Sequence, residues 1–374
     1  MSKRRVAVVF GGRSAEHEIS CISARSVMDA LDPERFEVVP IGITRDGRWR
    51  ILPGPPALPA ESGRMPEVGA GDGDPVALAP ADGATHELVG EGGSRGRIDV
   101  VFPVLHGPFG EDGAFQGFLE LAGVPYVGAG VLGSAVGMDK VVQKAVWTAA
   151  GLPVVPAEGV REAEWRDDPD AVLARALALG FPLFVKPSAL GSSVGITRAD
   201  DPAALPGSLE EAFRYGRRVV MERAVDRPRE IECAVLGNDE PVASVPGEIV
   251  PRDHPFYDYD AKYLDEDGAE LRIPAPLDAA TTATVQRLAV AAFRALDLAG
   301  MARVDFFIDA GGDVWLNEIN TIPGFTSISM YPKLWAASGV PYPELIAQLL
   351  DLAEERFAAE RAKVLVPREL DEGR

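Results

Sequence analysis

The chain has 374 residues, more than one ordinary hydrophobic core accommodates, so we expect three domains. With 47% hydrophobic and 25% charged residues and no apolar run long enough to span a bilayer, the composition is typical of a globular enzyme and argues against a membrane protein. A net charge of -20 disfavours nucleic-acid binding, which depends on lysine and arginine neutralising phosphates. Cys21 and Cys233 lack the spacing of a disulfide framework or a zinc site, which fits a reducing, cytoplasmic location.

The first third of the chain alternates apolar strands with helical stretches, an order typical of an α/β domain with a parallel sheet. We expect this domain to cover residues 1–133. Within it, residues 53–96 are rich in Gly, Pro, Ala and acids and show no sustained period, which predicts a surface insertion. The expected strands and helices are, in chain order, 6–10, 20–31, 36–43, 98–105 and 114–122.

The pattern changes after Gly128. Apolar residues at helical spacing over 134–150 open a second domain, expected at 134–229. From Glu230 onward the strands are longer and alternate better, which predicts an α+β domain on an antiparallel sheet at 230–374, ending in an amphipathic helix. The expected fold class is therefore one parallel α/β domain followed by two α+β domains.

Two strands near the C-terminus, 303–308 and 314–320, are predicted to form a hairpin. Since side chains alternate along a strand, Arg303 and Asp305 share one face, and so do Glu318 and Asn320. Two carboxylates and an amide oxygen, without His or Cys, suit Mg²⁺ held jointly with nucleotide phosphates. On these residues alone, the solvated face of an ordinary hairpin is an equally good interpretation.

A second candidate is Lys186, at the end of an apolar strand and followed by a Gly/Ser loop. A buried lysine needs an anion, and such a loop can direct backbone N–H groups at a phosphate. It is not a Walker A loop, because the Gly-Lys-Ser/Thr order is absent. A flexible hairpin tip beside a surface lysine remains the alternative, but together with the acidic hairpin the loop favours a nucleotide and metal site.

A glycine pattern supports a different class of protein. Gly128-Ala-Gly130-Val-Leu-Gly133 fits the dinucleotide fingerprint and opens a helix, which keeps an NAD-dependent oxidoreductase as a distant alternative. The strand before it is very short, and this interpretation leaves Lys186 without a role. The chain's first turn, 11–20, joins a strand to a helix whose N–H groups favour an anion, although Glu16 is also common as a plain helix-start acid.

Six segments occur in an order that resembles the D-alanine:D-alanine ligase family of the ATP-grasp superfamily, over nearly the whole chain except 53–96 and the C-terminal tail. They are Gly11–Ser20, Leu105–Gly107, Met138–Lys140, Val185–Ser193, Tyr257–Tyr263 and Asn317–Gly324. The resemblance implies three domains, the last two of which clasp ATP. It also implies ligation of two D-alanines through a D-alanyl phosphate, with release of ADP and phosphate, for peptidoglycan precursors. A ligase that takes D-lactate or D-serine as acceptor is the alternative.

The resemblance further implies the cofactors ATP and Mg²⁺, with Mn²⁺ as a substitute and two divalent ions expected, the substrates D-alanine and ATP, and a homodimer. Without the resemblance, the favoured interpretations of His106, Lys262 and Tyr263 are a core histidine, a solvated lysine and an ordinary aromatic. By the same resemblance, the tyrosine at position 263 implies D-alanine rather than D-lactate as acceptor. The implied roles are catalysis for Glu16, Ser192, Tyr263 and Arg303, phosphate binding for Lys140, Lys186 and Lys262, adenine binding for Glu222 and Ala224, ribose binding for Glu230, substrate binding for His106, Gly324 and Ser329, and metal binding for Asp305, Glu318 and Asn320.

Overall fold

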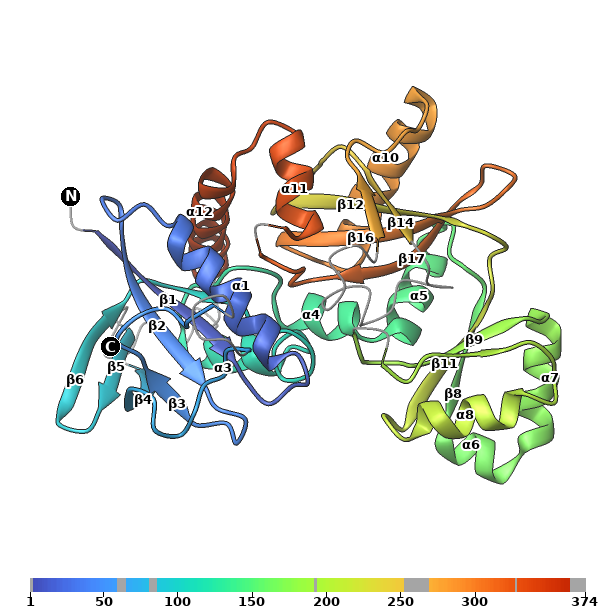
Figure 1. Cartoon of the computed structure of the whole chain (residues 1–374), viewed down its shortest axis with the longest axis horizontal. Coiled ribbons are helices and arrows are strands. Elements are labelled where there is room, and N and C mark those ends of the chain that lie inside the picture. The colour runs from blue at the N-terminus through green and yellow to red at the C-terminus, as the bar shows by residue number, and fades with distance from the viewer. Residues whose placement is uncertain are drawn as a thin grey trace, which may run out of the picture.

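The protein is described by a computed structural model that covers residues 3–58, 65–80, 86–191, 194–251, 269–326 and 328–363. Within these ranges the chain forms three β-sheets with helices packed on them (Figure 1). This confirms the expected mixture of α/β and α+β units. Among the described helices, none has both the length and the apolar character needed to cross a membrane.

The first sheet is seven-stranded with the order β6-β5-β4-β3-β2-β1-β7. Only β1 pairs in parallel, with β2 on one side and β7 on the other. β1 and β7 are buried on both faces, and Val6, Val8 and Phe10 have no exposed surface. The elements of this unit are β1 (Arg4–Gly11), α1 (His17–Ala30), β2 (Phe36–Ile43), β3 (Trp49–Ile51), β4 (Asp74–Pro80), β5 (His86–Gly90), β6 (Gly93–Ile98), β7 (Val100–Pro103) and α3 (Ala114–Ala122).

Two expectations for this unit were wrong. The sheet is mixed rather than parallel, because β3 to β6 pair antiparallel. Residues 53–96 are also more than a surface insertion, since β4, β5 and most of β6 fall inside that range and extend the sheet. The sequence pattern did not predict these strands, because each strand buries only a few apolar side chains, such as those of Val76, Leu78 and Leu88. Glycines, prolines and charged residues lie between them and hide the alternation.

The second sheet is a small antiparallel one with the order β10-β9-β11-β8. Its core joins strand residues such as Val185 and Met221 to helix residues such as Val172 and Leu209. It forms the lower right part of Figure 1. Its elements are β8 (Ala157–Arg161), α6 (Glu162–Asp167), α7 (Pro169–Leu179), β9 (Leu183–Pro187), β10 (Thr197–Ala199), α8 (Leu205–Phe213) and β11 (Arg218–Arg223).

The third sheet is six-stranded, with the order β15-β14-β12-β16-β17 and β13 paired to β12. Helix α10 packs on it together with α5, whose Trp147 is fully buried and donates from Nε1 to the Ala292 carbonyl at 3.1 Å. The elements are α4 (Val131–Met138), α5 (Lys140–Ala149), β12 (Arg229–Gly237), β13 (Val242–Ala243), β14 (Gly247–Pro251), β15 (Ala269–Arg272), α10 (Ala279–Ala295), β16 (Gly300–Ile308), β17 (Val314–Asn320) and α11 (Met330–Ala337).

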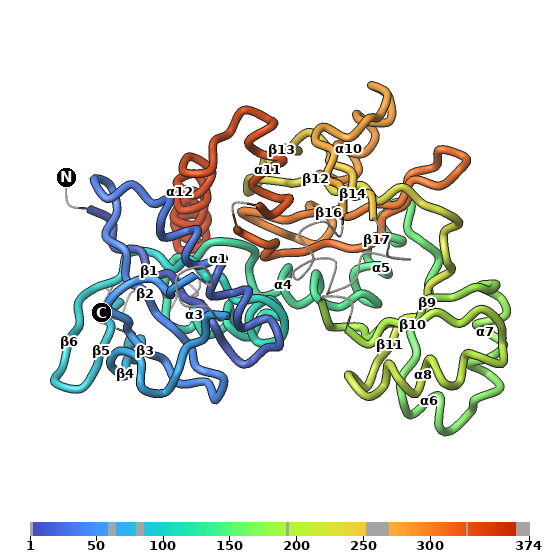
Figure 2. The backbone as a smooth tube through the Cα atoms, viewed as in Figure 1, coloured from blue at the N-terminus to red at the C-terminus, as the bar shows by residue number. Residues whose placement is uncertain are grey.

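The last described helix, α12 (Tyr342–Arg361), joins the first and third sheets. Figure 2 shows it beside α1, which is far from it in sequence. One continuous apolar core contains Phe10 of β1, Leu349 of α12 and Met301 of β16. Outside that core, Arg4 and Asp351 form an ion pair at 2.7 Å. The helix therefore fixes the first unit against the third, and a cavity lies between them.

Candidate active site

A cavity of about 700 Å³ lies where loops of all three units meet. Glu16, His106 and Glu111 come from the first unit, and Leu190 and Gly191 from the loop after β9. Lys140 comes from α5, and Glu232, Arg303, Glu318 and Asn320 come from the third sheet. The sequence-predicted residues that line it are Glu16, His106, Lys140, Arg303, Glu318, Asn320, Gly324 and Ser329.

The acidic hairpin is β16 and β17, and its polar residues face one another. Asp305 lies opposite Glu318 in register, and Arg303 lies opposite Asn320. Arg303 donates from Nε and Nη2 to the two oxygens of Asp305, both at 2.7 Å, and Asn320 donates from Nδ2 to Asp305 Oδ2 at 3.1 Å. Only 17% of the Arg303 side chain and 13% of the Asp305 side chain are exposed, so the interpretation as a solvated hairpin face was wrong.

Glu232 on β12 belongs to this cluster, although the sequence analysis missed it. It lies opposite Asp305 in register, lines the cavity, and places Oε2 3.0 Å from Arg303 Nε. Burial alone would lower the pKa of Arg303, but Asp305 and Glu232 raise it well above its ordinary value, so the guanidinium stays charged. A glutamate within an otherwise apolar strand, two residues after Glu230, was the available signal.

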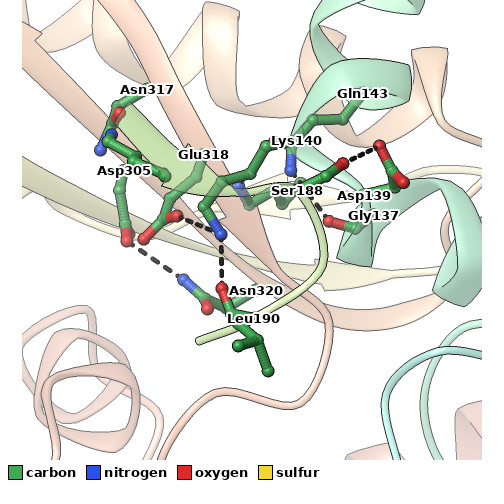
Figure 3. A network of polar contacts seen from close by, with 12 residues as sticks. Gly137, Asp139, Lys140, Gln143, Ser188, Leu190, Asp305, Asn317, Glu318 and Asn320 are labelled. Atoms are coloured by element: carbon green, nitrogen blue, oxygen red, sulfur yellow. Dashed lines mark hydrogen bonds and ion pairs between the residues drawn. The ribbon is translucent and has the colours of Figure 1, made fainter. Parts of the chain in front are cut away.

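Lys140 begins α5 and connects that helix to the hairpin (Figure 3). Its Nζ lies 3.2 Å from Glu318 Oε2 and donates to the Leu190 carbonyl at 2.8 Å. The preceding Asp139 caps the helix by accepting from the N–H groups of Val141 and Val142, each at 3.1 Å. Asp139 in turn accepts from Ser188 Oγ at 2.6 Å, so the loop after β9 is held beside Lys140.

The hairpin offers the donor set that a hard divalent cation prefers. Within the described residues there is no group of three or more His, Cys, Asp or Glu side chains able to hold a metal. A cation here would therefore depend on the carboxylates of Asp305 and Glu318, the amide of Asn320 and oxygens from a phosphate ligand. That set fits Mg²⁺, which is usually held by one or two carboxylates together with substrate phosphates.

Behind Lys140, Lys186 and Glu222 form a buried ion pair that also includes Lys144. Lys186 Nζ contacts Glu222 Oε2, and Lys144 Nζ lies 3.0 Å from Glu222 Oε1. Burial would raise the pKa of Glu222, but the two lysine charges lower it to about 2. Burial alone would lower the pKa of Lys186, but the charges of Glu222 and Glu318 outweigh burial and raise it. For Lys144 the balance is reversed, because burial and the nearby charge of Lys186 lower its pKa. Sequence analysis missed Lys144, four residues after Lys140 on the same helix face.

At the other end of the cavity, Glu16 approaches two loops. A Cβ atom on Gly107 would lie 2.8 Å from Glu16 Oε2, and one on Gly191 would lie 3.6 Å from it. His106 is 6% exposed, with Nδ1 3.2 Å from the Ile322 carbonyl and Nε2 3.3 Å from Ser23 Oγ. Burial lowers the pKa of His106, although the negative charge of Glu16 acts in the opposite direction. The lowered pKa favours the neutral imidazole.

Glu111 is a further carboxyl in the cavity lining that sequence analysis missed. It accepts from Gly107 N at 2.6 Å and from Ile322 N at 3.3 Å, so it joins the His106 loop to the segment that follows β17. Burial, and next the negative charge of Glu16, raise the pKa of Glu111 to about 8. No sequence pattern distinguished it from the surface acids around it.

Gly324 and Ser329 lie together where α11 begins, as expected for a shared subsite. A Cβ on Gly324 would lie 3.0 Å from Ser329 Oγ, which also accepts from Thr326 N at 3.1 Å. Ile328, beside them, is 72% exposed and lines the cavity. This part of the cavity lining therefore combines the apolar side chain of Ile328 with the hydroxyl of Ser329.

Other expected residues are farther from the cavity or lie outside the described ranges. The N–H of Ala224 donates to the Pro182 carbonyl at 2.9 Å, which leaves only its own carbonyl for a base. Glu230 is half-buried on β12 and its charge acts on Lys186. Neither residue, nor Lys186 or Glu222, is among those that line the cavity. Ser192, Lys262 and Tyr263 lie outside the described residues.

The glycine pattern at 128–133 has a packing role. A Cβ on Gly133 would lie 2.7 Å from Leu298 Cδ2 and 2.9 Å from the Asp297 carbonyl, so α4 packs directly against the turn before β16. Tyr126, before the pattern, makes only an isolated bridge to Val101. Because residues 123–130 before α4 contain only this isolated bridge and no strand, the glycine pattern lacks the strand–turn–helix context that the dinucleotide interpretation requires.

The chain matches two family models, described as D-ala D-ala ligase N-terminus over residues 5–129 and D-ala D-ala ligase C-terminus over residues 146–351. A D-alanine--D-alanine ligase of Streptomyces coelicolor is 51% identical over 366 residues, covering 94% of this chain and 93% of that protein. One of Heliobacterium modesticaldum is 49% identical over 363 residues, covering 96% of each.

Solved structures give the same result. The D-alanine-D-alanine ligase from Coxiella burnetii superposes with a TM-score of 0.82 at 39% identity, covering 97% of both chains. The VanG D-Ala:D-Ser ligase from Enterococcus faecalis also gives 0.82, at 34% identity, covering 94% of this chain and 100% of that one.

Proposed function

The chain belongs to the D-alanine–D-alanine ligase family, and we propose that it joins two D-alanines to D-alanyl-D-alanine while converting ATP to ADP and phosphate. The product would enter peptidoglycan precursor synthesis. The observation that carries the proposal is one cavity lined both by Glu16 and by the cluster of Lys140, Arg303 and Glu318. This supports an arrangement in which Glu16 would bind the ammonium of an amino acid substrate while the cluster would bind the phosphate.

Amide formation from a free carboxylate is unfavourable in water, so the carboxylate of the first D-alanine has to be activated. Transfer of the γ-phosphoryl group of ATP to that carboxylate gives D-alanyl phosphate, and the amine of the second D-alanine then displaces phosphate. Such a transfer requires mainly positioning and stabilisation of charge. Arg303 and Lys140, both largely buried, supply fixed positive charge where the transferred group would lie.

Each substrate has candidate contacts in the cavity. Glu16 would bind the ammonium of the first D-alanine, with the neutral His106 beside it. Gly324 and Ser329 would shape the site of the second D-alanine. ATP would contact Lys140 and Lys186 through its phosphates, Glu222 and the Ala224 carbonyl through adenine, and Glu230 through ribose. Ser192, Lys262 and Tyr263 keep the roles that the family resemblance implies.

Asp305, Glu318 and Asn320 would hold Mg²⁺, with Mn²⁺ as a substitute and two ions in the complete site. The metal would neutralise phosphate charge during the transfer. In the structure Arg303 and Asn320 contact Asp305, while Lys140 pairs with Glu318. These contacts support the proposal, because they hold the acidic groups in place within the structure.

We further propose that the protein is a cytoplasmic homodimer. Helices α3 and α4 contact each other and expose Phe118 (41%), Leu121 (89%), Val131 (41%) and Leu132 (61%). Scattered apolar surface is ordinary, but neighbouring exposed side chains on two packed helices favour an interface with a second copy.

Leu121→Glu should shift the protein from dimer to monomer in size-exclusion chromatography with light scattering, and an unchanged mass would refute this surface. The buried free thiols of Cys21 and Cys233 agree with a reducing compartment.

The decisive experiment measures phosphate release and product identity with ATP and D-alanine, D-lactate, D-serine, L-alanine or no amino acid. We expect release only when D-alanine is present, with D-alanyl-D-alanine as the main product. Release with D-alanine but preferential formation of a D-lactate or D-serine product would replace the acceptor assignment. Reduction of NAD would refute the ligase reaction itself.

A further inference from the structure

Lys144 is a buried cation for which the proposed function has not provided a role. It lies on α5 one turn after Lys140, and only 5% of its side chain is exposed. Unlike Lys140, it is not among the residues that line the cavity. A buried ammonium requires anionic or polar partners, so its contacts indicate what it does.

Those contacts connect three elements. Lys144 Nζ lies 3.0 Å from Glu222 Oε1 on β11 and donates at 2.8 Å to the Asn317 carbonyl on β17. β11 belongs to the second sheet and β17 to the third, while α5 itself packs on the third. The residue next to Asn317 is Glu318, so the same ammonium contacts the proposed adenine-binding carboxylate and the backbone of the proposed metal hairpin.

Glu222 divides its two oxygens between two lysines. Oε1 is engaged by Lys144 and Oε2 by Lys186, and only 3% of the Glu222 side chain is exposed. If Lys186 is to contact a phosphate, it must give up some or all of this ion pair. Without a second cation, that movement would leave a buried carboxylate uncompensated, which is strongly unfavourable.

We propose that Lys144 is a positioning residue of the nucleotide site, which keeps Glu222 neutralised and fixed against β17 while Lys186 exchanges Glu222 for a phosphate oxygen of ATP. This inference rests on the proposed function, because it takes the Lys186 and Glu222 assignments from it. It assigns different functions to the two lysines that contact the Glu222 carboxylate: Lys186 binds phosphate, and Lys144 keeps Glu222 neutralised. Lys144 acts through Glu222 and does not touch the substrate.

The test compares Lys144→Met, Lys144→Arg and the control Lys363→Met in the full-length protein. Lys363 is an exposed lysine after α12. ADP binding is measured by calorimetry, and KM for ATP, KM for D-alanine and kcat are measured by phosphate release. We expect Lys144→Met to weaken ADP binding and raise KM for ATP by at least tenfold, while KM for D-alanine changes less than twofold. Lys144→Arg should recover much of the loss, and Lys363→Met should match the parent.

Thermal melting with and without ADP separates the proposed role from simple loss of structure. Without nucleotide, Lys186 still pairs with Glu222 in Lys144→Met, so the melting temperature should stay close to that of the parent, whereas its rise on addition of ADP should be clearly smaller than in the parent. Parent-like ADP binding in a folded Lys144→Met protein would overturn the inference. So would equal losses in the ATP and D-alanine parameters. If instead the parent binds ADP and shows no ligation, the proposed function fails while the Lys144 comparison still stands on binding alone.

Discussion

Lys140 Nζ lies 3.2 Å from Glu318 Oε2 in the lining of the cavity, although the two residues are 178 positions apart in sequence. The contact joins the start of α5 to the acidic hairpin, and each side chain also has a proposed ligand of opposite charge. Lys140 would contact a phosphate and Glu318 a divalent cation. The ion pair therefore pre-arranges two groups that a metal–nucleotide complex would use together.

Glu318→Gln should abolish ligation without unfolding the protein. The substitution keeps the shape but removes one of two carboxylates from the proposed metal site, and we expect kcat/KM to fall at least about 100-fold. Lys140 retains its bond to the Leu190 carbonyl, so the loss of stability should stay below the roughly 3–5 kcal/mol typical of breaking a buried pair. Initial rates over a Mg²⁺ titration and thermal melting measure both quantities. Asp313→Asn, an exposed change in the same hairpin, is the control. Parent-like turnover at ordinary Mg²⁺ would remove Glu318 from the metal site.

Lys186→Met should raise KM for ATP by about tenfold or more and leave KM for D-alanine nearly unchanged. The methionine removes a proposed phosphate contact, while Lys144 stays within 3.0 Å of Glu222 and neutralises it. Loss of stability should therefore be smaller than the roughly 3–5 kcal/mol typical of breaking a buried pair. Steady-state kinetics with each substrate varied, beside urea denaturation, tests this. A drop in stability with unchanged ATP parameters would make Lys186 a purely structural residue.

The success of the sequence analysis at the hairpin has a physical reason. That Arg303 shares a face with Asp305, and Glu318 with Asn320, follows from the local period of two residues in each strand. That the two faces coincide depends on a β-bulge between Asp305 and Phe306, which shifts the register by one so that Asp305 lies opposite Glu318. The role of Lys144 is not local. It depends on α5 packing across β11 and β17, and the residues it contacts are 78 and 173 positions away. No pattern within one segment contains that information.

The same distinction, between local sequence patterns and contacts between distant segments, explains which parts of the fold the sequence predicted. The periodicity of the amphipathic helix at the C-terminus predicted the helix itself, but not that α12 completes the core of the first unit beside Phe10. Strands β4 and β5 were missed because their inward positions are few and are interrupted by turns and charged residues. Glu111 was missed because its environment, and so its raised pKa, is created by two loops and Glu16.

Gly107→Ala should impair D-alanine binding specifically. Gly107 has φ of +75°, which L-residues rarely adopt, and an added Cβ would lie 2.8 Å from Glu16 Oε2. The carboxylate would have to move, so KM for D-alanine should rise about tenfold while KM for ATP changes less than twofold. Gly312→Ala is a matched control, because φ is +88° there and no atom lies within 4 Å of the new Cβ. Equal behaviour of the two variants would show that backbone strain alone is responsible.

Glu111→Gln should change how stability depends on pH. Glu111 has a pKa of about 8 in the folded protein against an ordinary value of 4.5, because it is buried and faces the charge of Glu16. Between those values the unfolded chain has released the proton and the folded protein still holds it. The number of bound protons is then lower in the unfolded state, so the contribution of Glu111 to the free energy of unfolding falls as pH rises through this window.

Glutamine cannot titrate, so the variant lacks this decline. The substitution also removes one of the oxygens that accept from Gly107 N and Ile322 N, which lowers stability by about 1 kcal/mol at every pH. The free energy of unfolding of Glu111→Gln minus that of the parent should therefore increase from pH 5 to pH 8, by up to about 1.4 kcal/mol per pH unit. Urea denaturation at four pH values measures the difference, with the exposed Glu34→Gln as a control that should run parallel to the parent. Parallel curves for Glu111→Gln and the parent would mean that Glu111 is ionised throughout the window, so that its two backbone donors and the cations of the cavity outweigh burial and the charge of Glu16.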